Sequence, residues 1–341
     1  SIGGWRVGRS GSSTLSAPMP AFVLQPDSMV IVCGTSAASQ LQQFGRTFGL
    51  TSFPDLSSGG SLIWLQNPQG AIIHAVEYSP AWHSNALKAE GGWTLEMVDV
   101  KNPCAGAGNW KSSTNSRGGT PAQTNSVAVT NADAAPPQLE NAFAIDNRTL
   151  VLRFNEPLDS ARAVITSNYL VSTGIGSPVS ASCTAPLFNI VQLQLATPLQ
   201  AGQLYTITVT GVNDCSGTAI GGFNTARVGL AAPADSLDVI INEILFDPRG
   251  GGSDYVELYN RSNKLINLRD LFLANRASNG TVANIRNIAT ENRILFPGSY
   301  VAVTDNPANI RQEYVVKDPA AVLQVSSLPV SYTHLRAHET G

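Results

Sequence analysis

The stretch VIINEILFDPRGGGSDYVELYN (239–260) contains two apolar runs separated by a segment rich in glycine and aspartate. In the second run, YVELY (255–259), Val256 and Leu258 alternate with two tyrosines and Glu257. Successive side chains of a β-strand point to opposite faces, so Val256 and Leu258 are predicted to face a core and the other three to face outward. The stretch therefore predicts strands of a sheet with one buried face.

Short runs of the same kind recur along the chain and alternate with clusters of Gly, Pro, Asn, Asp and Ser. This pattern is typical of stacked β-sheets, and we predict an all-β fold. The clearest strands are MVIVC (29–33), SLIWL (61–65), TLVLRF (149–154), VQLQLA (191–196), YTITVTGV (205–212) and YVAVT (300–304). One helix is predicted, at ASQLQQFGRTFG (38–49), where it ends at a glycine.

Composition limits the classes of function. The chain has 341 residues, of which 43% are hydrophobic and 13% charged, and its formal net charge is -3. The length suits two or three domains. The charge gives little electrostatic support for nucleic-acid binding. No apolar run approaches the roughly 20 residues that a membrane-spanning helix needs.

Two proline-bearing breaks, TNADAAPPQ (130–138) and GLAAPADS (229–236), divide the chain into three sections. The first and third sections repeat one another, because FVLQPDSMVIV (22–32) aligns with RILFPGSYVAV (293–303). Two flanking pairs align as well: 4–15 with 270–282, and 50–60 with 324–331. One module is therefore predicted to occur twice.

The two copies lack different parts. The third section opens with residues 239–268, which have no equivalent in the first, and the first continues through 91–127, which have none in the third. We expect the first module to lack its opening strands, the last to lack its closing half, and the chain to be part of a longer protein. After Pro329 the composition changes to VSYTHLRAHETG (330–341).

Four cysteines occur at positions 33, 104, 183 and 215, without CxxC or zinc-ligand spacing. In a chain poor in charge, we interpret them as two disulfides formed in an oxidising compartment. The domain division predicts Cys33 with Cys104 and Cys183 with Cys215. The alternative interpretation is four buried thiols.

The stretch INEILFDPRGGGSDYVELYN (241–260) resembles the opening strands of a lamin-tail-type domain, an Ig-like β-sandwich. GGWTLEMVDVKNPCAGAGNW (91–110) resembles the closing half of the secreted bacterial version. The middle section is similar to the bacterial Ig-like domain of S-layer-type surface proteins, through TLVLRFNEPLDSA (149–161) and LQAGQLYTITVTGVNDCSGTAI (199–220). In the latter, Asp214 is predicted to cap its turn.

These resemblances imply tandem Ig-like β-sandwiches. The implied domains are a lamin-tail-type domain at 1–129, an Ig-like domain at 134–230, a second lamin-tail-type domain at 237–329, and a non-native tail at 330–341. The tail resembles translated sequencing-adapter sequence. The alternative is a genuine polar tail in which His334 and His338 form a metal-binding pair.

Catalytic motifs are not recognised in the sequence, and we expect no enzymatic activity and no cofactor. His74 and His83 are candidate general bases, but structural roles are favoured. Two interpretations are open for Trp82, Trp93 and Trp110. Either all three form a face on which sugars stack, or Trp93 and Trp110 are part of the core.

One set of carboxylates is a weak candidate for a hard-cation site, since oxygen ligands suit calcium. The alternative is that two of them bond neighbouring strands while the aspartates shape the turn. The set comprises Glu243, Asp247, Asp254 and Glu257.

The resemblances imply a non-catalytic scaffold or adhesive spacer of a secreted or surface-exposed bacterial protein, although SIGGWRVG (1–8) carries no signal peptide. The expected partners are neighbouring domains of a longer chain and weakly bound surface glycans or proteins. The alternative is an accessory region of a secreted nuclease or phosphoesterase whose catalytic domain lies outside residues 1–341.

Overall fold

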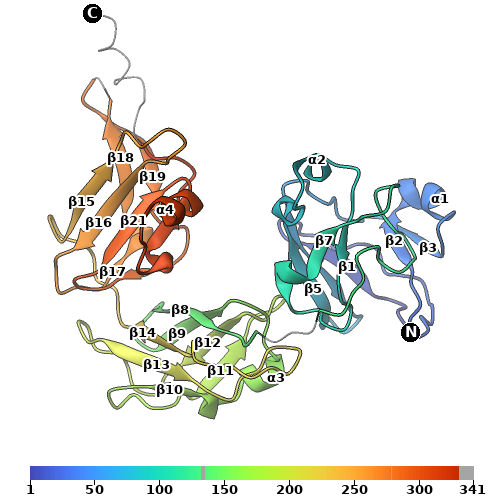
Figure 1. Cartoon of the computed structure of the whole chain (residues 1–341). Helices are drawn as coiled ribbons and strands as arrows, with labels where there is room; N and C mark the ends of the chain where they lie inside the picture. Colours follow the sequence, from blue (N-terminus) through green and yellow to red (C-terminus); the bar gives the residue numbers. More distant parts are fainter. Residues whose placement is uncertain (132–134, 278, 330–341) are drawn as a thin grey trace, which may run out of the picture.

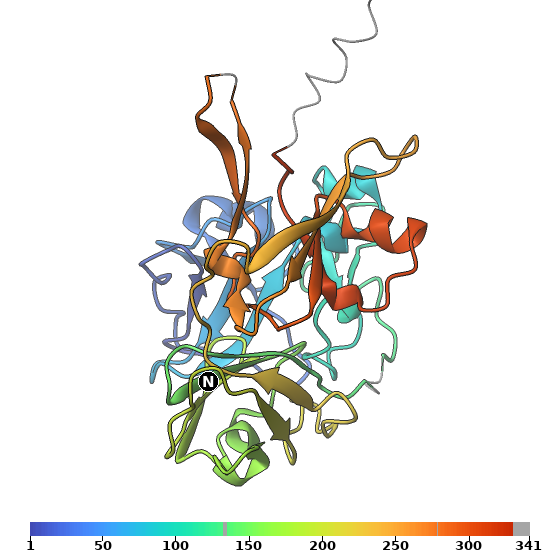
Figure 2. The ribbon, with the colours of Figure 1, turned by 90° about the vertical axis from the view of Figure 1, so that its left-hand side faces the viewer.

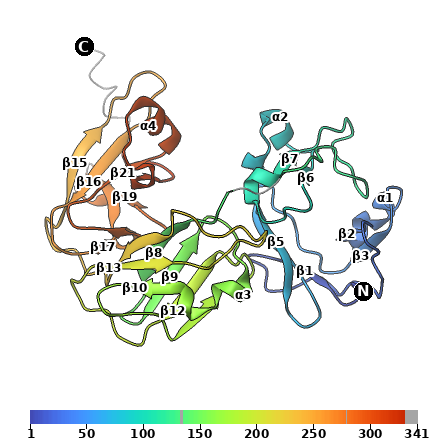
Figure 3. The ribbon, with the colours of Figure 1, turned by 60° about the horizontal axis from the view of Figure 1, so that its bottom comes forward.

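The computed structural model describes residues 1–131, 135–277 and 279–329 and shows an all-β chain of three units (Figure 1). The middle unit connects the other two, and the first and last residues that the structure describes, Ser1 and Pro329, belong to different outer units (Figures 1 and 3). The predicted tail at 330–341, with His334 and His338, lies outside the described residues.

The first unit contains a three-stranded sheet, β1-β4-β5, and two two-stranded sheets, β2-β3 and β6-β7. Its elements are β1 (Arg6–Arg9), β2 (Ile31–Gly34), η1 (Thr35–Ala37), α1 (Ala38–Leu41), β3 (Thr47–Leu50), β4 (Ser61–Gln66), β5 (Ile72–Tyr78), η2 (Pro80–Trp82), α2 (Ala86–Ala89), β6 (Leu95–Met97), η3 (Gly106–Asn109) and β7 (Trp110–Ser112).

The middle unit is a sandwich of two sheets, β11-β12-β9-β8 and β10-β13-β14. Alternating residues of both sheets, such as Leu150, Leu193 and Ile207, are fully buried between them. Its elements are β8 (Leu139–Ala144), β9 (Thr149–Phe154), α3 (Ser160–Ala163), η4 (Thr166–Asn168), β10 (Tyr169–Val171), β11 (Ser180–Cys183), β12 (Ile190–Gln194), β13 (Tyr205–Val209) and β14 (Thr225–Val228).

The third unit is built on the sheet β15-β16-β21-β22, and its β18-β19 hairpin projects from the body (Figure 2). As predicted, Val256 and Leu258 of β16 are buried in its core. Its elements are β15 (Val239–Leu245), β16 (Tyr255–Asn260), β17 (Ile266–Asn267), η5 (Leu268–Asp270), β18 (Phe272–Arg276), β19 (Val282–Asn287), β20 (Ile294–Leu295), β21 (Tyr300–Thr304), α4 (Pro307–Glu313), η6 (Pro319–Ala321) and β22 (Val322–Gln324).

The repeat predicted from the sequence is present in the pairing of strands. β2 pairs in parallel with β3, and Val32 lies opposite Phe48. β21 pairs in parallel with β22, and Val303, the aligned counterpart of Val32, lies opposite Leu323. A short helix follows the first strand of each pair, α1 in one unit and α4 in the other. The first and third units therefore share this strand–helix–strand element in the same register.

The helix predicted over residues 38–49 is wrong in extent. α1 ends at Leu41, and residues from Thr47 onward form β3. β3 finds a partner in β2, and its Phe48 and Leu50 are buried in the core of the first unit. Pairing with a strand distant in sequence outweighs the local helical tendency.

Candidate functional site: the domain junctions

A disulfide joins the first unit to the middle unit. Cys104, in the loop between β6 and β7, is bonded to Cys215, in the loop after β13, and their Cα atoms are 6.1 Å apart. This separation lies within the range that a disulfide spans. The bond closes a loop over a sequence separation of 111 residues, which includes the linker between the two units.

The turn that presents Cys215 is ordered by the preceding residue. Asp214 is 1% exposed, and its Oδ1 accepts hydrogen bonds from the backbone N–H groups of Ser216, Gly217 and Thr218 at 2.7–2.8 Å. The predicted cap is confirmed. A buried carboxylate that accepts three amide hydrogen bonds fixes the loop conformation, so Cys215 is presented in one orientation.

On the other side of the bond, the loop that carries Cys104 also holds the chain leaving the first unit. Asn131 donates its backbone N–H to Asp99 Oδ2 at 2.9 Å, and Asn109 Nδ2 donates to the carbonyl oxygens of Asp99 and Asn102. The amide hydrogen bonds from Asn131 and Lys101 lower the pKa of Asp99. The disulfide and the start of the linker are thus attached to one polar network.

The predicted cysteine pairing is wrong. Cys33 is buried in β2, with its Sγ 3.9 Å from the Phe48 carbonyl oxygen, and Cys183 lies in β11. Both are free thiols, and burial raises the pKa of Cys183 to about 11. The prediction assumed that each disulfide stays within one domain. Instead, the two cysteines that lie in turn sequences, NPCAGAG (102–108) and NDCSGT (213–218), meet at the domain junction.

The second junction, between the middle and third units, is non-covalent. The Arg227 guanidinium lies 4.0 Å from the centre of the Phe296 ring, and Asn141 Nδ2 donates to the Asn292 carbonyl oxygen at 2.9 Å. Arg153 forms an ion pair with Glu291. These contacts are non-covalent and partly exposed, whereas a covalent bond restrains the first junction.

The second linker is bonded to the third unit by one lysine. Lys264 Nζ lies 2.5 Å from Asp235 Oδ2 and 2.6 Å from Asp238 Oδ2. The hydrogen bond from Lys264 lowers the pKa of Asp238, and the two aspartates raise the pKa of Lys264. The Ala232 N–H also donates to the Leu265 carbonyl oxygen at 2.8 Å.

The candidate histidines are not in one place. His83 Nδ1 lies 2.8 Å from Ser112 Oγ, whereas His74 lies on β5 opposite Leu65 of β4. Beside His83, the rings of Trp82 and Trp110 are 6.0 Å apart and inclined by 31°.

The tryptophans do not fill a core. Trp82, Trp93 and Trp110 are all half-buried, and Lys88 Nζ lies 4.2 Å from the centre of the Trp93 ring.

The four candidate carboxylates are only partly brought together. Glu243 lies opposite Glu257 across β15 and β16; Glu243 accepts from the Tyr255 hydroxyl and Glu257 from Asn242, both at 2.7 Å. Burial and the neighbouring Glu243 raise the pKa of Tyr255. Asp247 is exposed. Asp254 directly precedes β16 and is buried, and its backbone carbonyl oxygen accepts a hydrogen bond from the Thr304 hydroxyl. Over the described ranges, no three His, Cys, Asp or Glu side chains are grouped so that they could hold a metal ion.

Comparison with known protein families identifies two of the units. Residues 232–331 match the family model described as Lamin Tail Domain, and residues 123–226 match the one described as Bacterial Ig-like domain. The chain therefore contains a lamin tail domain and a bacterial Ig-like domain, both β-sandwich families. Among curated proteins, no match is found. Within the described residues, no helix is long and apolar enough to cross a membrane.

Solved structures give distant matches to a bacterial S-layer protein. The crystal structure of the N-terminal part of the S-layer protein SbsC is 19% identical, with a TM-score of 0.27, and the match covers 49% of this chain and 45% of that one. The structure of rSbsC(31-844) is 14% identical at the same TM-score, and the match covers 50% of this chain and 32% of that one. The matched region is thus less than half of either relative.

Proposed function

We propose that the chain is a non-catalytic structural region of a secreted or surface-exposed bacterial protein, in which β-sandwich domains are held in a defined order. The observation that carries this proposal is the Cys104–Cys215 disulfide between two domains. Disulfides persist in oxidising, mainly extracellular compartments. A bond placed between domains restrains their relative position, and this is the property that a scaffold or spacer needs.

The proposed domain limits are 1–129, 134–230 and 237–329. Three separate hydrophobic cores, one in each unit, support this division. The family matches at 123–226 and 232–331 overlap the second and third domains. We propose the first domain as a second lamin-tail-type domain, because it shares the β2–α1–β3 element with its counterpart in the third.

Peptide mapping without reductant, combined with small-angle scattering, tests the structural role. We expect a proteolytic peptide pair linked through Cys104 and Cys215, and a distribution of interdomain distances that broadens when the bond is reduced. Unlinked Cys104 in the folded, oxidised protein would remove the basis of the proposal. If the purified chain released nucleotides from nucleic acid, or phosphate from phosphoesters, in the presence of Mg²⁺ or Mn²⁺, the result would contradict a non-catalytic role.

The adhesive part of the role is proposed for the face around Trp82 and Trp110. Two half-buried, inclined indole rings offer apolar faces on which sugar rings stack. Tryptophan fluorescence titrated with oligosaccharides should change in the parent chain and not in Trp82→Ala. Identical titrations for both proteins would exclude this face.

A further inference from the structure

The main sheet of the third unit has an outer face, on the side away from the core. Val256 and Leu258 of β16 pack in the core, so Tyr255, Glu257 and Tyr259 point to the opposite side of the sheet. In that sheet β16 lies between β15 and β21 (Figure 1). Side chains from three adjacent strands therefore form the outer face.

Strand register arranges the outer face in three rows, each of which crosses β15, β16 and β21. Tyr255 and Tyr259 belong to the two flanking rows and Glu257 to the middle one. Successive rows are about 6.6–6.8 Å apart, because they are two residues apart along each strand. The rows are Leu245–Tyr255–Thr304, Glu243–Glu257–Ala302 and Ile240–Tyr259–Tyr300.

Both flanking rows hold a pair of tyrosine rings in contact. Tyr259 and Tyr300 are stacked, with ring centres 4.5 Å apart and planes inclined by 27°. Tyr255 meets Tyr314, the residue after α4, edge to face at 5.8 Å. Tyr300 is 48% exposed and Tyr314 46%. The flanking rows therefore present apolar ring surface and phenolic hydroxyl groups to a ligand.

The middle row places two carboxylates directly opposite each other. Glu243 and Glu257 are cross-strand partners, and each accepts a hydrogen bond from a neutral group, the Tyr255 hydroxyl or the Asn242 amide. None of the ion pairs within residues 1–131, 135–277 and 279–329 includes either glutamate. Like charges at opposite positions destabilise a sheet, and a bound cation would offset this cost.

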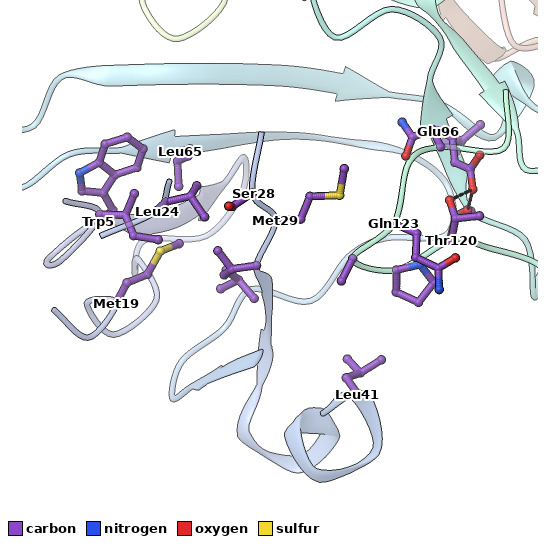
Figure 4. Close-up of a pocket in the computed structure, with 18 residues that line it drawn as sticks. Trp5, Met19, Leu24, Ser28, Met29, Leu41, Leu65, Glu96, Thr120 and Gln123 are labelled. Atoms are coloured by element: carbon purple, nitrogen blue, oxygen red, sulfur yellow. Dashed lines mark hydrogen bonds between the residues drawn. The ribbon is translucent and has the colours of Figure 1, made fainter. Parts of the chain in front are cut away.

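A buried glutamate of the first unit shows the contrast. Glu96 is 5% exposed, and it accepts hydrogen bonds from Thr120 and from the backbone and hydroxyl groups of Ser126. Figure 4 shows the contact between Glu96 and Thr120. The protein itself therefore supplies the donors that Glu96 needs. Glu243 is exposed and accepts one hydrogen bond, so its carboxylate can accept further bonds from a ligand.

The surroundings of the glutamate pair select an organic cation. In the described part of the chain, no three His, Cys, Asp or Glu side chains form a group suited to a metal ion. Calcium needs six or more oxygen ligands, which this pair does not supply. An ammonium group forms charge-assisted hydrogen bonds with carboxylates and is attracted by aromatic rings within about 6 Å. Tyrosine rows on both sides of the pair therefore suit an organic ammonium group.

The backbone of β16 favours a glycan over a peptide. Its main-chain groups are hydrogen-bonded to β15 on one side and to β21 on the other, so the outer face has none to offer an added peptide strand. What it offers is two carboxylates with aromatic rings on either side. A chain of amino sugars matches this arrangement, because it combines ammonium groups with rings that stack on tyrosine.

We propose that the outer face binds a glycan whose sugars carry free amino groups. An ammonium group of the glycan lies between Glu243 and Glu257, and the neighbouring sugar rings pack on the two tyrosine pairs. The outer face belongs to the third unit and is separate from the Trp82–Trp110 face of the first. Either site can therefore fail its test without affecting the other.

The test is calorimetric titration of the full chain with a glucosamine hexamer. The matched ligand is the N-acetylglucosamine hexamer, which has the same rings without the positive charges. We expect the N-acetylated hexamer to bind at least ~5-fold more weakly, and the difference to shrink at high salt, where exposed charges are screened. Equal affinities at low salt, or no binding of the glucosamine hexamer at millimolar concentration, would overturn the proposal.

A charge-removing variant assigns the binding to the glutamate pair. Glu243→Gln combined with Glu257→Gln should weaken binding of the glucosamine hexamer at least ~5-fold. Its Tm should be equal to that of the parent or higher, because two like charges are removed. Asp247→Asn, which removes an exposed carboxylate outside the three rows, is the matched control and should bind as the parent does. Parental affinity in the double variant would overturn the proposal.

The role of the tyrosine rows is tested separately. Tyr300→Ala should weaken binding of both hexamers about 2- to 10-fold, because it removes stacking and leaves the charges in place. Hexalysine carries ammonium groups without sugar rings and should bind more weakly than the glucosamine hexamer. Equal affinity for hexalysine, with no effect of Tyr300→Ala, would mean that the outer face binds any polycation, and the glycan would be ruled out as its specific ligand.

Discussion

Removal of the interdomain disulfide should destabilise the bacterial Ig-like domain, although its hydrophobic core is left intact. When this domain unfolds in the oxidised protein, the bond to Cys104 keeps the unfolded chain closed on itself. For the sequence separation of 111 residues, the chain-entropy relation gives about 4.8 kcal/mol, and measured values are usually about 2–4 kcal/mol. For a domain of this size, each kcal/mol lowers the Tm by about 4–8 °C. We therefore expect a Tm about 10 °C lower, or more.

The assay is scanning calorimetry of Cys104→Ser, Cys215→Ser and the double variant, with Cys183→Ser as the matched control. The single and double variants should lose the same amount, because each removes the same bond. The control removes a thiol that takes no part in the disulfide and should leave the parent's response to reductant unchanged. The reasoning is refuted if both junction variants keep the parental Tm, or if the double variant loses the sum of the single ones.

Three further predictions concern single side chains. Burial alone would raise the pKa of Glu96, but hydrogen bonds from Thr120 and Ser126 lower it overall. The ionised Glu96 therefore stabilises the fold fully at any pH above its pKa in the unfolded chain, and this stabilisation is lost as the pH falls through its pKa in the folded protein. Glu96→Gln should cost about 1.5–3 kcal/mol near neutral pH and flatten the acid limb of a stability–pH curve, and an unchanged limb would count against this role. Asp214→Ala should slow disulfide formation on refolding, seen as thiols that persist in a timed alkylation assay, whereas Asp214→Asn should keep part of the rate. Arg227→Ala should loosen the second junction by about 0.5–1 kcal/mol, detectable as broader interdomain distances in scattering with no change in the Tm of either domain.

Strand positions follow from sequence where apolar alternation is bounded by turn residues. TLVLRF (149–154) and YVAVT (300–304) coincide with β9 and β21. The internal repeat was also recoverable, because the order of apolar residues reflects core positions that both units use. The strand β3 could not be predicted from the sequence, because its Thr47–Leu50 segment becomes a strand only through parallel pairing with β2.

The candidate sites depended on contacts between domains, which local patterns do not encode. Cys104 and Cys215 belong to different domains, and their pairing follows from how the loops at the junction meet. A local signal did exist: the two bonded cysteines lie in turn sequences, whereas Cys33 and Cys183 lie in strands. The four candidate carboxylates are close in sequence but do not form one cluster. Strand register places Glu243 opposite Glu257, whereas Asp247 and Asp254 lie apart from them.

The two junctions should respond differently to mechanical load, since only one of them is covalent. When the chain is pulled from its ends, tension passes from Cys104 directly to Cys215, and the residues between them carry none. The second junction is non-covalent, and an exposed ion pair such as Arg153–Glu291 contributes little in water.

In single-molecule stretching, we therefore expect the oxidised chain to separate first at the second junction. The residues between Cys104 and Cys215 should not extend while the disulfide is intact. Reduction should add the contour length of that loop, which for a separation of 111 residues is about 380 Å at roughly 3.4 Å per residue. Cys104→Ser should show the long contour length with or without reductant, and Cys33→Ser should behave as the parent does. Equal contour lengths for the oxidised and reduced parent would mean that the bond does not carry force between the domains, and the proposed role as a scaffold would lose its mechanical basis.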